Sequence, residues 1–162
     1  MEIKRLEDSG FSFRDVYDLV QKAFLERLSQ KLRFGLSFMT EEEMLASIPG
    51  ATTLVAVENG ALLGTVSIET EKVDCKGIHY CYLSTVAVDP KAAGKGVGTK
   101  LLEEAIKISR EKGCNYVESD TAALAESSVR MHQKAGFKIV EMTPNTRAEA
   151  TKTIAFRFVE QR

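Results

Sequence analysis

Residues that build disulfide frameworks and metal sites are scarce in this sequence. Its 162 residues include three cysteines, Cys75, Cys81 and Cys114, and only two histidines. The cysteines are odd in number and show no CxxC spacing, which argues against a disulfide scaffold and against a zinc site. We therefore expect three free thiols in a reducing cytoplasm and no metal site.

Net charge and long apolar runs are also missing. The 22 lysines and arginines against 23 aspartates and glutamates leave a formal net charge of −1. The whole chain therefore offers no electrostatic attraction to nucleic acid or to an anionic membrane. No apolar run reaches the length of a membrane span, and the charged start MEIKRLEDSG is unlike a signal peptide. These features predict a cytoplasmic protein with neither a nucleic-acid nor a membrane partner.

Prolines are few, and linkers and repeats are not visible. Pro49, Pro90 and Pro144 all fall between segments of regular hydrophobic spacing. Apolar residues make up 44% of the chain, which is enough for burial to drive folding. The length fits one domain, so we predict a single domain over residues 1–162.

What the sequence does contain is a regular alternation of helix and strand patterns. Apolar spacings of three and four residues predict a helix over 12–32, and Thr40 with Glu43 predicts the capping box of a second helix. Asn59-Gly60 predicts the tight turn of a hairpin. Further strands are expected at 2–7, 77–88, 114–121, 137–142 and 153–160, and further helices at 98–112 and 126–135.

The order of these elements predicts the fold class. Three consecutive strands in the first half predict an antiparallel run, and the strand–helix–strand unit that follows predicts a right-handed parallel crossover. The strand over 77–88 is apolar on both faces, so it should be central and buried. We expect an α/β protein with a mixed, mostly antiparallel sheet and helices on both faces.

The stretch DPKAAGKGVGTKLLEEA, residues 89–105, places three glycines at a helix start, surrounded by Lys91, Lys95 and Lys100. Free N–H groups at a helix N-terminus bind phosphate, and glycine lets the ligand approach the backbone. The spacing GKGVG fits neither the dinucleotide fingerprint nor the P-loop. A mobile glycine turn with solvated lysines is the competing interpretation.

Three stretches together resemble the GNAT superfamily of acetyl-CoA-dependent N-acetyltransferases: LSTVAVDPKAAGKGVGTKLLEEA, then YVESDT, then SSVRMHQKAGF. The resemblance runs from Tyr82 to about Val140. It implies a sheet that is splayed between its two parallel middle strands, acetyl-CoA as co-substrate, and an amine acceptor. The cofactor-binding residues that it implies are Val86, Ala87, Val88, Ala93, Gly94, Lys95, Gly96, Val97, Gly98, Thr99, Ser128 and His132.

The resemblance also implies how these residues act. The backbone of the strand at 86–88 would pair with the pantetheine arm, and the N–H groups of about 94–99 would hold the pyrophosphate. The second strand of the splay would be 116–120. The amine would attack the thioester directly, while backbone N–H groups polarise its carbonyl.

Three positions depart from the family pattern. Ala93 stands where a Gln or Arg is usual, and Ala125 stands where an Asn often touches the cofactor. His132 stands where a Tyr is proposed to protonate the leaving thiolate. Histidine can donate a proton or hydrogen-bond a thiolate. The alternative is a buried histidine whose ring is satisfied by a backbone carbonyl, and both interpretations stay open.

Removal of the proton from the acceptor amine needs a base or a water chain. Glu69 and Glu118 are the first candidates, ahead of His79 and Asp120, although each is also explained as an ordinary polar residue. Ser84 stands where many relatives carry a glutamate. Two further side chains on the same strand face could line the acceptor pocket or belong to the core, Tyr80 and Tyr82.

The acceptor itself is not identified by the sequence. Phe34 and Phe38 lie in a break between helices where a lid could form, and Arg147 lies in a loop where it could meet an acidic acceptor. A homodimer is common among relatives, and nothing in the sequence decides between monomer and dimer. Two other functions stay open: a non-catalytic acyl-CoA-binding or regulatory domain of the same fold, and an unrelated α/β binding module.

Overall fold

The computed structural model describes residues 1–29, 39–123, 125–144 and 152–159. Phe34, Phe38 and Arg147 lie outside these residues. The elements are, in chain order, β1 (Glu2–Arg5), η1 (Leu6–Asp8), α1 (Phe13–Ser29), α2 (Glu41–Ala46), β2 (Thr52–Glu58), β3 (Ala61–Val73), β4 (His79–Val88), η3 (Pro90–Ala92), α3 (Val97–Glu111), β5 (Tyr116–Ala122), α4 (Glu126–Lys134), β6 (Lys138–Pro144) and β7 (Lys152–Val159). This is the predicted order of helices and strands.

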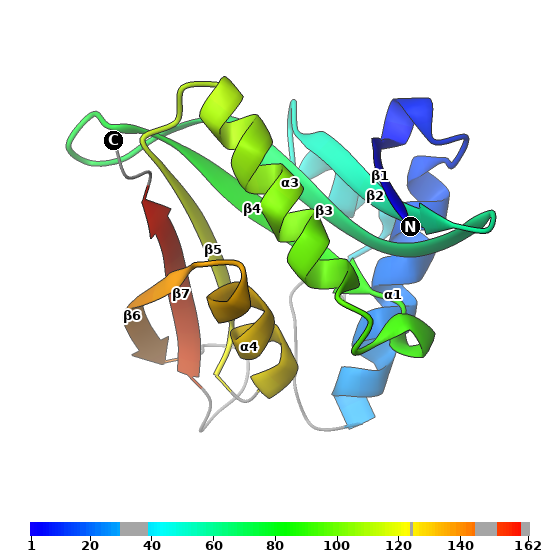
Figure 1. Ribbon diagram of the computed structural model, residues 1–162. Coiled ribbons are helices and arrows are strands. Elements are labelled where there is room, and N and C mark those ends of the chain that lie inside the picture. The colour runs from blue at the N-terminus through cyan, green and yellow to red at the C-terminus, as the bar shows by residue number, and fades with distance from the viewer. Residues whose placement is uncertain (30–38, 124, 145–151, 160–162) are drawn as a thin grey trace.

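The strands form one mixed sheet in the order β1-β2-β3-β4-β5-β7-β6. All neighbours are antiparallel except β4 and β5. This parallel pair is short, since it joins only Tyr80 to Tyr116, Cys81 to Val117 and Tyr82 to Glu118. Beyond it the two strands diverge, as Figure 1 shows. The expected mostly antiparallel sheet, splayed between two parallel middle strands, is therefore confirmed.

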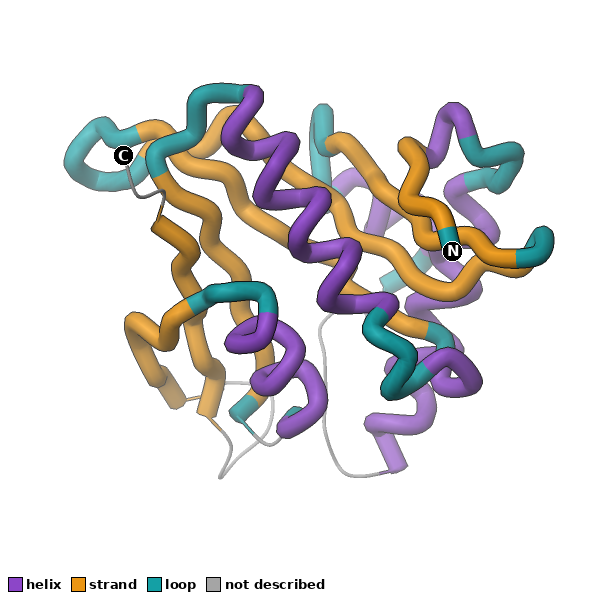
Figure 2. Tube along the Cα trace, viewed as in Figure 1, coloured by secondary structure: helices purple, strands orange, loops and turns teal. Residues whose placement is uncertain are grey.

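Helices cover both faces of the sheet, as predicted. In Figure 1, α3 and α4 lie in front of the strands and α1 lies behind them, and Figure 2 shows the same layers as purple tubes on either side of orange strands. The α3 face is sealed by Leu101, Leu102 and Ala105, which pack in one cluster with Val66 and Ile68 of β3. On the other face, buried α1 residues pack against Val55 of β2 and Ala87 of β4.

Local hydrogen bonds explain where several elements begin and turn. Thr40 and Glu43 form the predicted capping box at the start of α2. Asn59 and Gly60 both have positive φ, 50° and 74°, which is the conformation that the tight β2–β3 turn requires. Both predictions rest on residues close together in the sequence, and both are confirmed.

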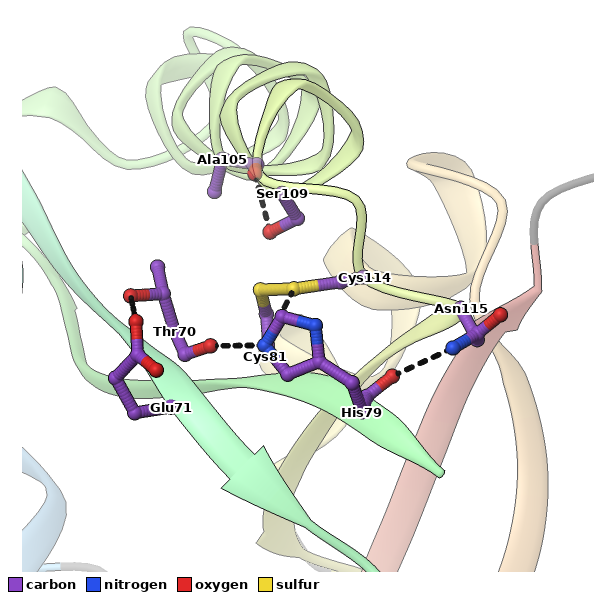
Figure 3. Close-up of a disulfide and its surroundings, with 8 residues drawn as sticks. All are labelled: Thr70, Glu71, His79, Cys81, Ala105, Ser109, Cys114 and Asn115. Atoms are coloured by element: carbon purple, nitrogen blue, oxygen red, sulfur yellow. Dashed lines mark hydrogen bonds between the residues drawn. A yellow bond between two sulfur atoms is a disulfide. The ribbon is translucent and has the colours of Figure 1, made fainter. Parts of the chain in front are cut away.

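The expectation of three free thiols is wrong for two of the cysteines. Cys81 of β4 and Cys114, which precedes β5, form a disulfide, with their Cα atoms 5.9 Å apart (Figure 3). Cys75 is free and exposed. Spacing in the sequence did not reveal the pair, because 33 residues separate the two cysteines and only the crossover through α3 brings them together.

No helix in the part of the chain that the structure describes is long and apolar enough to cross a membrane. Within the same residues, no group of three or more His, Cys, Asp or Glu side chains could hold a metal ion.

Candidate functional site

A cavity of about 440 Å³ opens where β4 leaves β5. Its walls come from α1, the end of β4, the loop that leads into α3, and α4. Ten of the residues expected to bind the cofactor line it: Val86, Ala87, Val88, Ala93, Gly94, Gly96, Val97, Gly98, Thr99 and Ser128. The structure thus gathers the glycine loop, the strand end and α4 around one space.

The end of β4 is turned toward this cavity by an irregularity at Thr85. This residue has φ 50°, which is uncommon for a β-branched side chain. The β3–β4 register shifts at the same place, between the pairs Thr65–Ala87 and Ser67–Ser84. Before the shift, Leu83 belongs to the α3 cluster, whereas after it Ala87 packs on the α1 side. A β-bulge of this kind interrupts the ladder and leaves backbone groups of β4 free to meet a ligand.

The glycine loop has the backbone conformation of an anion cradle. Gly94 and Gly96 both have φ 77°, and a Cβ built on either would meet no atom within 4 Å. Gly96 is the N-cap of α3 and has no side chain to occupy the first N–H groups of the helix. Those N–H groups and the positive helix end attract phosphate. The loop therefore has the open backbone that an anion-binding site requires, and its binding of a pyrophosphate stays a prediction.

Gly98 serves a different purpose from the other two glycines. It is buried in the first turn of α3, and a Cβ there would collide with Sδ of Met131 on α4 and touch Val88. The missing side chain therefore lets α3 and α4 approach closely beside the cavity. Close packing of the two helices therefore requires a glycine here, at a position that also lines the cavity.

An ion pair fixes the loop to α1. The Nζ of Lys22 lies 2.7 Å from Oδ2 of Asp89, and Oδ1 of Asp89 accepts the N–H of Lys91 at 2.9 Å. The hydrogen bond from Lys22 is the main reason that the pKa of Asp89 lies below its usual range. The loop is thus anchored at its first residue.

Sequence reasoning missed several wall residues that come from α1 and α4. Ala23 and Phe24 contribute from α1, and Arg130 and Lys134 contribute from α4. The two cations could have been found from the helical spacing of RMHQK, since they lie one turn apart and suit a phosphate group. Lys95 was predicted to bind the cofactor, and the structure places it in the exposed part of the loop.

His132 lies in the interior between α4 and β5 and not on the cavity wall. Its ring is 1% exposed and stacks on Phe156 with centroids 4.5 Å apart. Nδ1 lies 2.8 Å from the carbonyl oxygen of Ser128, and Nε2 lies 2.8 Å from Oγ of Ser119. Burial lowers the pKa of this imidazole, so it is neutral at neutral pH. These contacts match the alternative of a buried histidine satisfied by a backbone carbonyl.

The candidate carboxylate bases share the face of the sheet that lies on the α1 side. Glu118 pairs with Tyr82 across the parallel ladder, and Glu69 pairs with Tyr82 across β3 and β4. The hydroxyl of Tyr82 donates to Oδ2 of Asp120 at 2.9 Å. Burial, and then the neighbouring carboxylates, raise the pKa of Tyr82 far above its usual range, so its hydroxyl stays protonated.

Each of the two first candidates carries a counter-ion. Oε1 of Glu69 lies 3.2 Å from Nζ of Lys72, and the glutamate is 7% exposed. Oε1 of Glu118 lies 3.8 Å from a guanidinium nitrogen of Arg157. Asp120 is exposed, and its carboxylate accepts a hydrogen bond from the neutral Tyr82 hydroxyl. Glu69 and Glu118 therefore each lie beside a cation, whereas Asp120 contacts a neutral hydroxyl.

Three other predicted residues lie apart from the cavity walls. His79 contacts the carbonyl oxygen of Thr70 and lies beside the disulfide (Figure 3). Tyr80 stacks on Tyr116 with centroids 4.9 Å apart. Ser84 has a buried Oγ without a hydrogen-bond partner among the described residues, and strand alternation places it on the face of Tyr82.

Comparison with known proteins decides the family. The sequence model of the acetyltransferase (GNAT) family matches residues 13–137. The chain belongs to the GNAT acetyltransferase family. The matched region contains the bulged end of β4, the glycine loop, α3, β5 and α4, so it includes most of the residues that line the cavity.

Two curated relatives are similar over part of their length. The L-methionine sulfoximine/L-methionine sulfone acetyltransferase of Salmonella typhimurium is 27% identical over 68% of this chain and 64% of its own. The L-amino acid N-acyltransferase MnaT of Escherichia coli is 25% identical over 70% of this chain and 66% of its own. The match therefore spans slightly less than two thirds of either relative.

A solved acetyltransferase structure shows the same fold over nearly the whole chain. It is yncA of Salmonella typhimurium, determined with its cofactor acetyl-CoA. It superimposes with a TM-score of 0.75 at 20% sequence identity and covers 99% of this chain and 94% of its own. At this identity the likeness concerns the fold alone.

Proposed function

We propose that this protein transfers the acetyl group of acetyl-CoA directly to an amine acceptor. The observation that carries the proposal is the cavity at the splay of β4 and β5, where a bulged strand end meets an open glycine loop. Membership of the GNAT family supports the same conclusion.

The donor side of the site supplies binding and orientation. In the proposal, the N–H groups at the start of α3 hold the pyrophosphate, with Arg130 and Lys134 adding positive charge from α4. The backbone of Val86–Val88 pairs with the pantetheine arm. The bulge at Thr85 turns backbone groups toward the thioester carbonyl, where N–H donors would stabilise the negative charge that develops on its oxygen.

The acceptor side is proposed to be the sheet face that carries Tyr82, Glu118 and Asp120. An amine is mostly protonated at neutral pH, so it must lose a proton before its nitrogen attacks the carbonyl carbon. We propose Glu69 and Glu118 as proton acceptors, directly or through water, with Asp120 as the exposed carboxylate that first attracts the ammonium. The unpartnered hydroxyl of Ser84 is available to hydrogen-bond the acceptor.

The reaction then forms a C–N bond and breaks the C–S bond, and the coenzyme leaves as a thiolate that takes up a proton. For His132 the contacts favour a positioning role, because both ring nitrogens are engaged inside the protein. Proton donation by His132 would require the imidazole to leave Ser119 and accept a second proton.

The proposal extends to the location, partners and assembly state of the protein. We propose a cytoplasmic protein that acts on a small molecule or peptide and not on nucleic acid or a membrane, since its charge is nearly balanced. No resident metal is part of the proposal. A homodimer is the second assembly state to test beside the monomer, and light scattering after size-exclusion chromatography distinguishes the two.

The test measures binding and turnover separately. Acetyl-CoA should raise the melting temperature, and a panel of amino acids, aminosugars, polyamines and peptides should release free coenzyme A thiol with at least one acceptor. Binding without turnover on any amine would support the non-catalytic acyl-CoA-binding alternative. Absence of any stabilisation by acetyl-CoA or coenzyme A would contradict both and favour an unrelated binding module.

A further inference from the structure

The Cys81–Cys114 disulfide closes a covalent ring that contains the β4 end and the glycine loop of the candidate cofactor site. The 33-residue separation spans the bulged end of β4, η3, the glycine loop and all of α3. Cys81 also lies in the short parallel pairing with β5, where it faces Val117. The bond therefore ties the end of α3 to β4 at the point where the two halves of the sheet meet.

The two sulfur atoms differ in how they can be reached. Cys81 is fully buried, whereas Cys114 is 7% exposed and lies in the turn after α3, between the exposed residues Gly113 and Asn115. Each backbone N–H from Lys112 to Asn115 is hydrogen-bonded, with Cys114 N–H directed to Ser109 O at 3.1 Å and Asn115 N–H to His79 O at 2.9 Å. Opening of the turn would expose Cys114 first.

A hydrogen-bond donor lies beside the more accessible sulfur. Nε2 of His79 contacts the carbonyl oxygen of Thr70, and a carbonyl only accepts, so this nitrogen carries the ring hydrogen. The same nitrogen lies 3.9 Å from Sγ of Cys114 (Figure 3). In the reduced protein this N–H can be shared between the Thr70 carbonyl and a thiolate on Cys114, and the thiolate is the reactive form in exchange.

We propose that Cys81 and Cys114 form a reversible thiol–disulfide exchange site that controls the cofactor-binding segment. Its redox partner would be a low-molecular-weight thiol and the corresponding disulfide. In oxidation, the Cys114 thiolate attacks one sulfur of that disulfide and releases a thiolate. The Cys81 thiolate then attacks Sγ of Cys114 and releases the second one. Two protein thiols lose two electrons and two protons, and one small disulfide becomes two thiols.

The expected consequence is a difference in coenzyme A binding between the two forms, and this part rests on the proposed function. The disulfide holds the end of α3 against β4, so it restrains the helix whose first turn would bind the pyrophosphate. Reduction removes that restraint, and we expect the dissociation constant for coenzyme A to rise by about three- to tenfold.

The experiment is a redox titration of the whole protein in mixtures of reduced and oxidised glutathione. Alkylation of free thiols followed by mass spectrometry counts the thiols, and coenzyme A affinity and melting temperature are measured on both forms. We expect a reversible two-thiol transition. The Cys75→Ser variant is the matched control, because it removes the exposed cysteine and should leave the transition unchanged. His79→Leu should slow the exchange.

Several results would overturn the proposal. A pair that stays fully oxidised or fully reduced across the titration overturns the exchange site. Equal affinity for coenzyme A in both forms overturns control of the segment. If neither form binds coenzyme A, the proposed function fails, and the thiol count alone then decides whether the exchange site exists.

Discussion

The hydroxyl oxygen of Ser119 on β5 lies 2.8 Å from Nε2 of His132 on α4, inside the protein. Because Nδ1 faces the carbonyl oxygen of Ser128, the ring hydrogen belongs on Nδ1, and the Ser119 hydroxyl donates to Nε2. One hydrogen bond of this neutral imidazole, the one from Ser119, joins α4 to β5, and the other lies within α4. It therefore holds the helix that forms one wall of the cavity.

Replacement of His132 by Phe should lower the free energy of unfolding and leave kcat nearly unchanged. The change leaves Ser119 and the Ser128 carbonyl without these partners, at a cost of about 1–3 kcal/mol in the free energy of unfolding. We expect kcat to change little once the variant is folded, as measured by thiol release below its melting temperature. Ser119→Ala, which removes one bond, is the milder control. A large fall in kcat with an unchanged melting temperature would instead support proton donation by His132.

Stability should fall on mild acidification because of the same histidine. Burial is the main reason that the pKa of His132 is lowered in the folded protein. At pH values between the unfolded pKa of about 6.5 and the lower folded pKa, the unfolded chain therefore binds more protons than the folded one. The stabilisation is present above pH 6.5 and decreases as pH falls. Chemical denaturation at pH 7.5, 6.5 and 5.5 should show this slope. A His132→Phe variant with the same slope would contradict the assignment to His132.

Substitution of Gly96 by Ala should weaken acetyl-CoA binding beyond its effect on folding. The residue has φ 77°, so a side chain there costs about 1–2 kcal/mol of stability. It also adds a methyl group at the proposed pyrophosphate position. Gly50→Ala is the matched control, since Gly50 has φ 67° and equally open surroundings but does not line the cavity. Calorimetry should show lost affinity for Gly96→Ala and wild-type affinity for the control.

Substitution of Glu118 by Gln should reduce acceptor turnover without affecting the donor. Loss of a general base lowers the rate by about 10²–10⁴-fold, whereas loss of an ordinary polar group has little effect. We expect kcat to fall and the dissociation constant of acetyl-CoA to stay unchanged. Glu69→Gln tests the second candidate in the same assay, and Glu103→Gln on the exposed side of α3 is the control. Wild-type rates for both candidates would exclude them as bases.

The sequence predicts those parts of the structure whose decisive groups are close together in the chain. The capping box at Thr40 and the Asn59-Gly60 turn need only neighbouring residues. The helical spacing of α4 correctly predicts that His132 faces inward and is buried. Whether that ring faces the cavity or the sheet depends on Phe156, which lies on the last strand. That choice could not be read from the helix alone.

Features that depend on distant contacts escaped prediction. A β-branched residue is not expected at positive φ, so Thr85 gave no local sign of a bulge, which arises from its pairing with β3. Cys81 and Cys114 meet only after α3 has crossed the sheet. The packing role of Gly98 could not be predicted, because Met131, which a Cβ at this position would meet, belongs to another helix.

The short parallel pairing between β4 and β5 has a consequence for folding. β1 to β4 are neighbours in chain order, and β5 pairs with β7 beside β6, so each half of the sheet can form from its own contacts. The two halves join through three residue pairs only after the chain has made the crossover. Amide hydrogens along this junction should exchange sooner than those of β3, and a ligand bound there should slow their exchange.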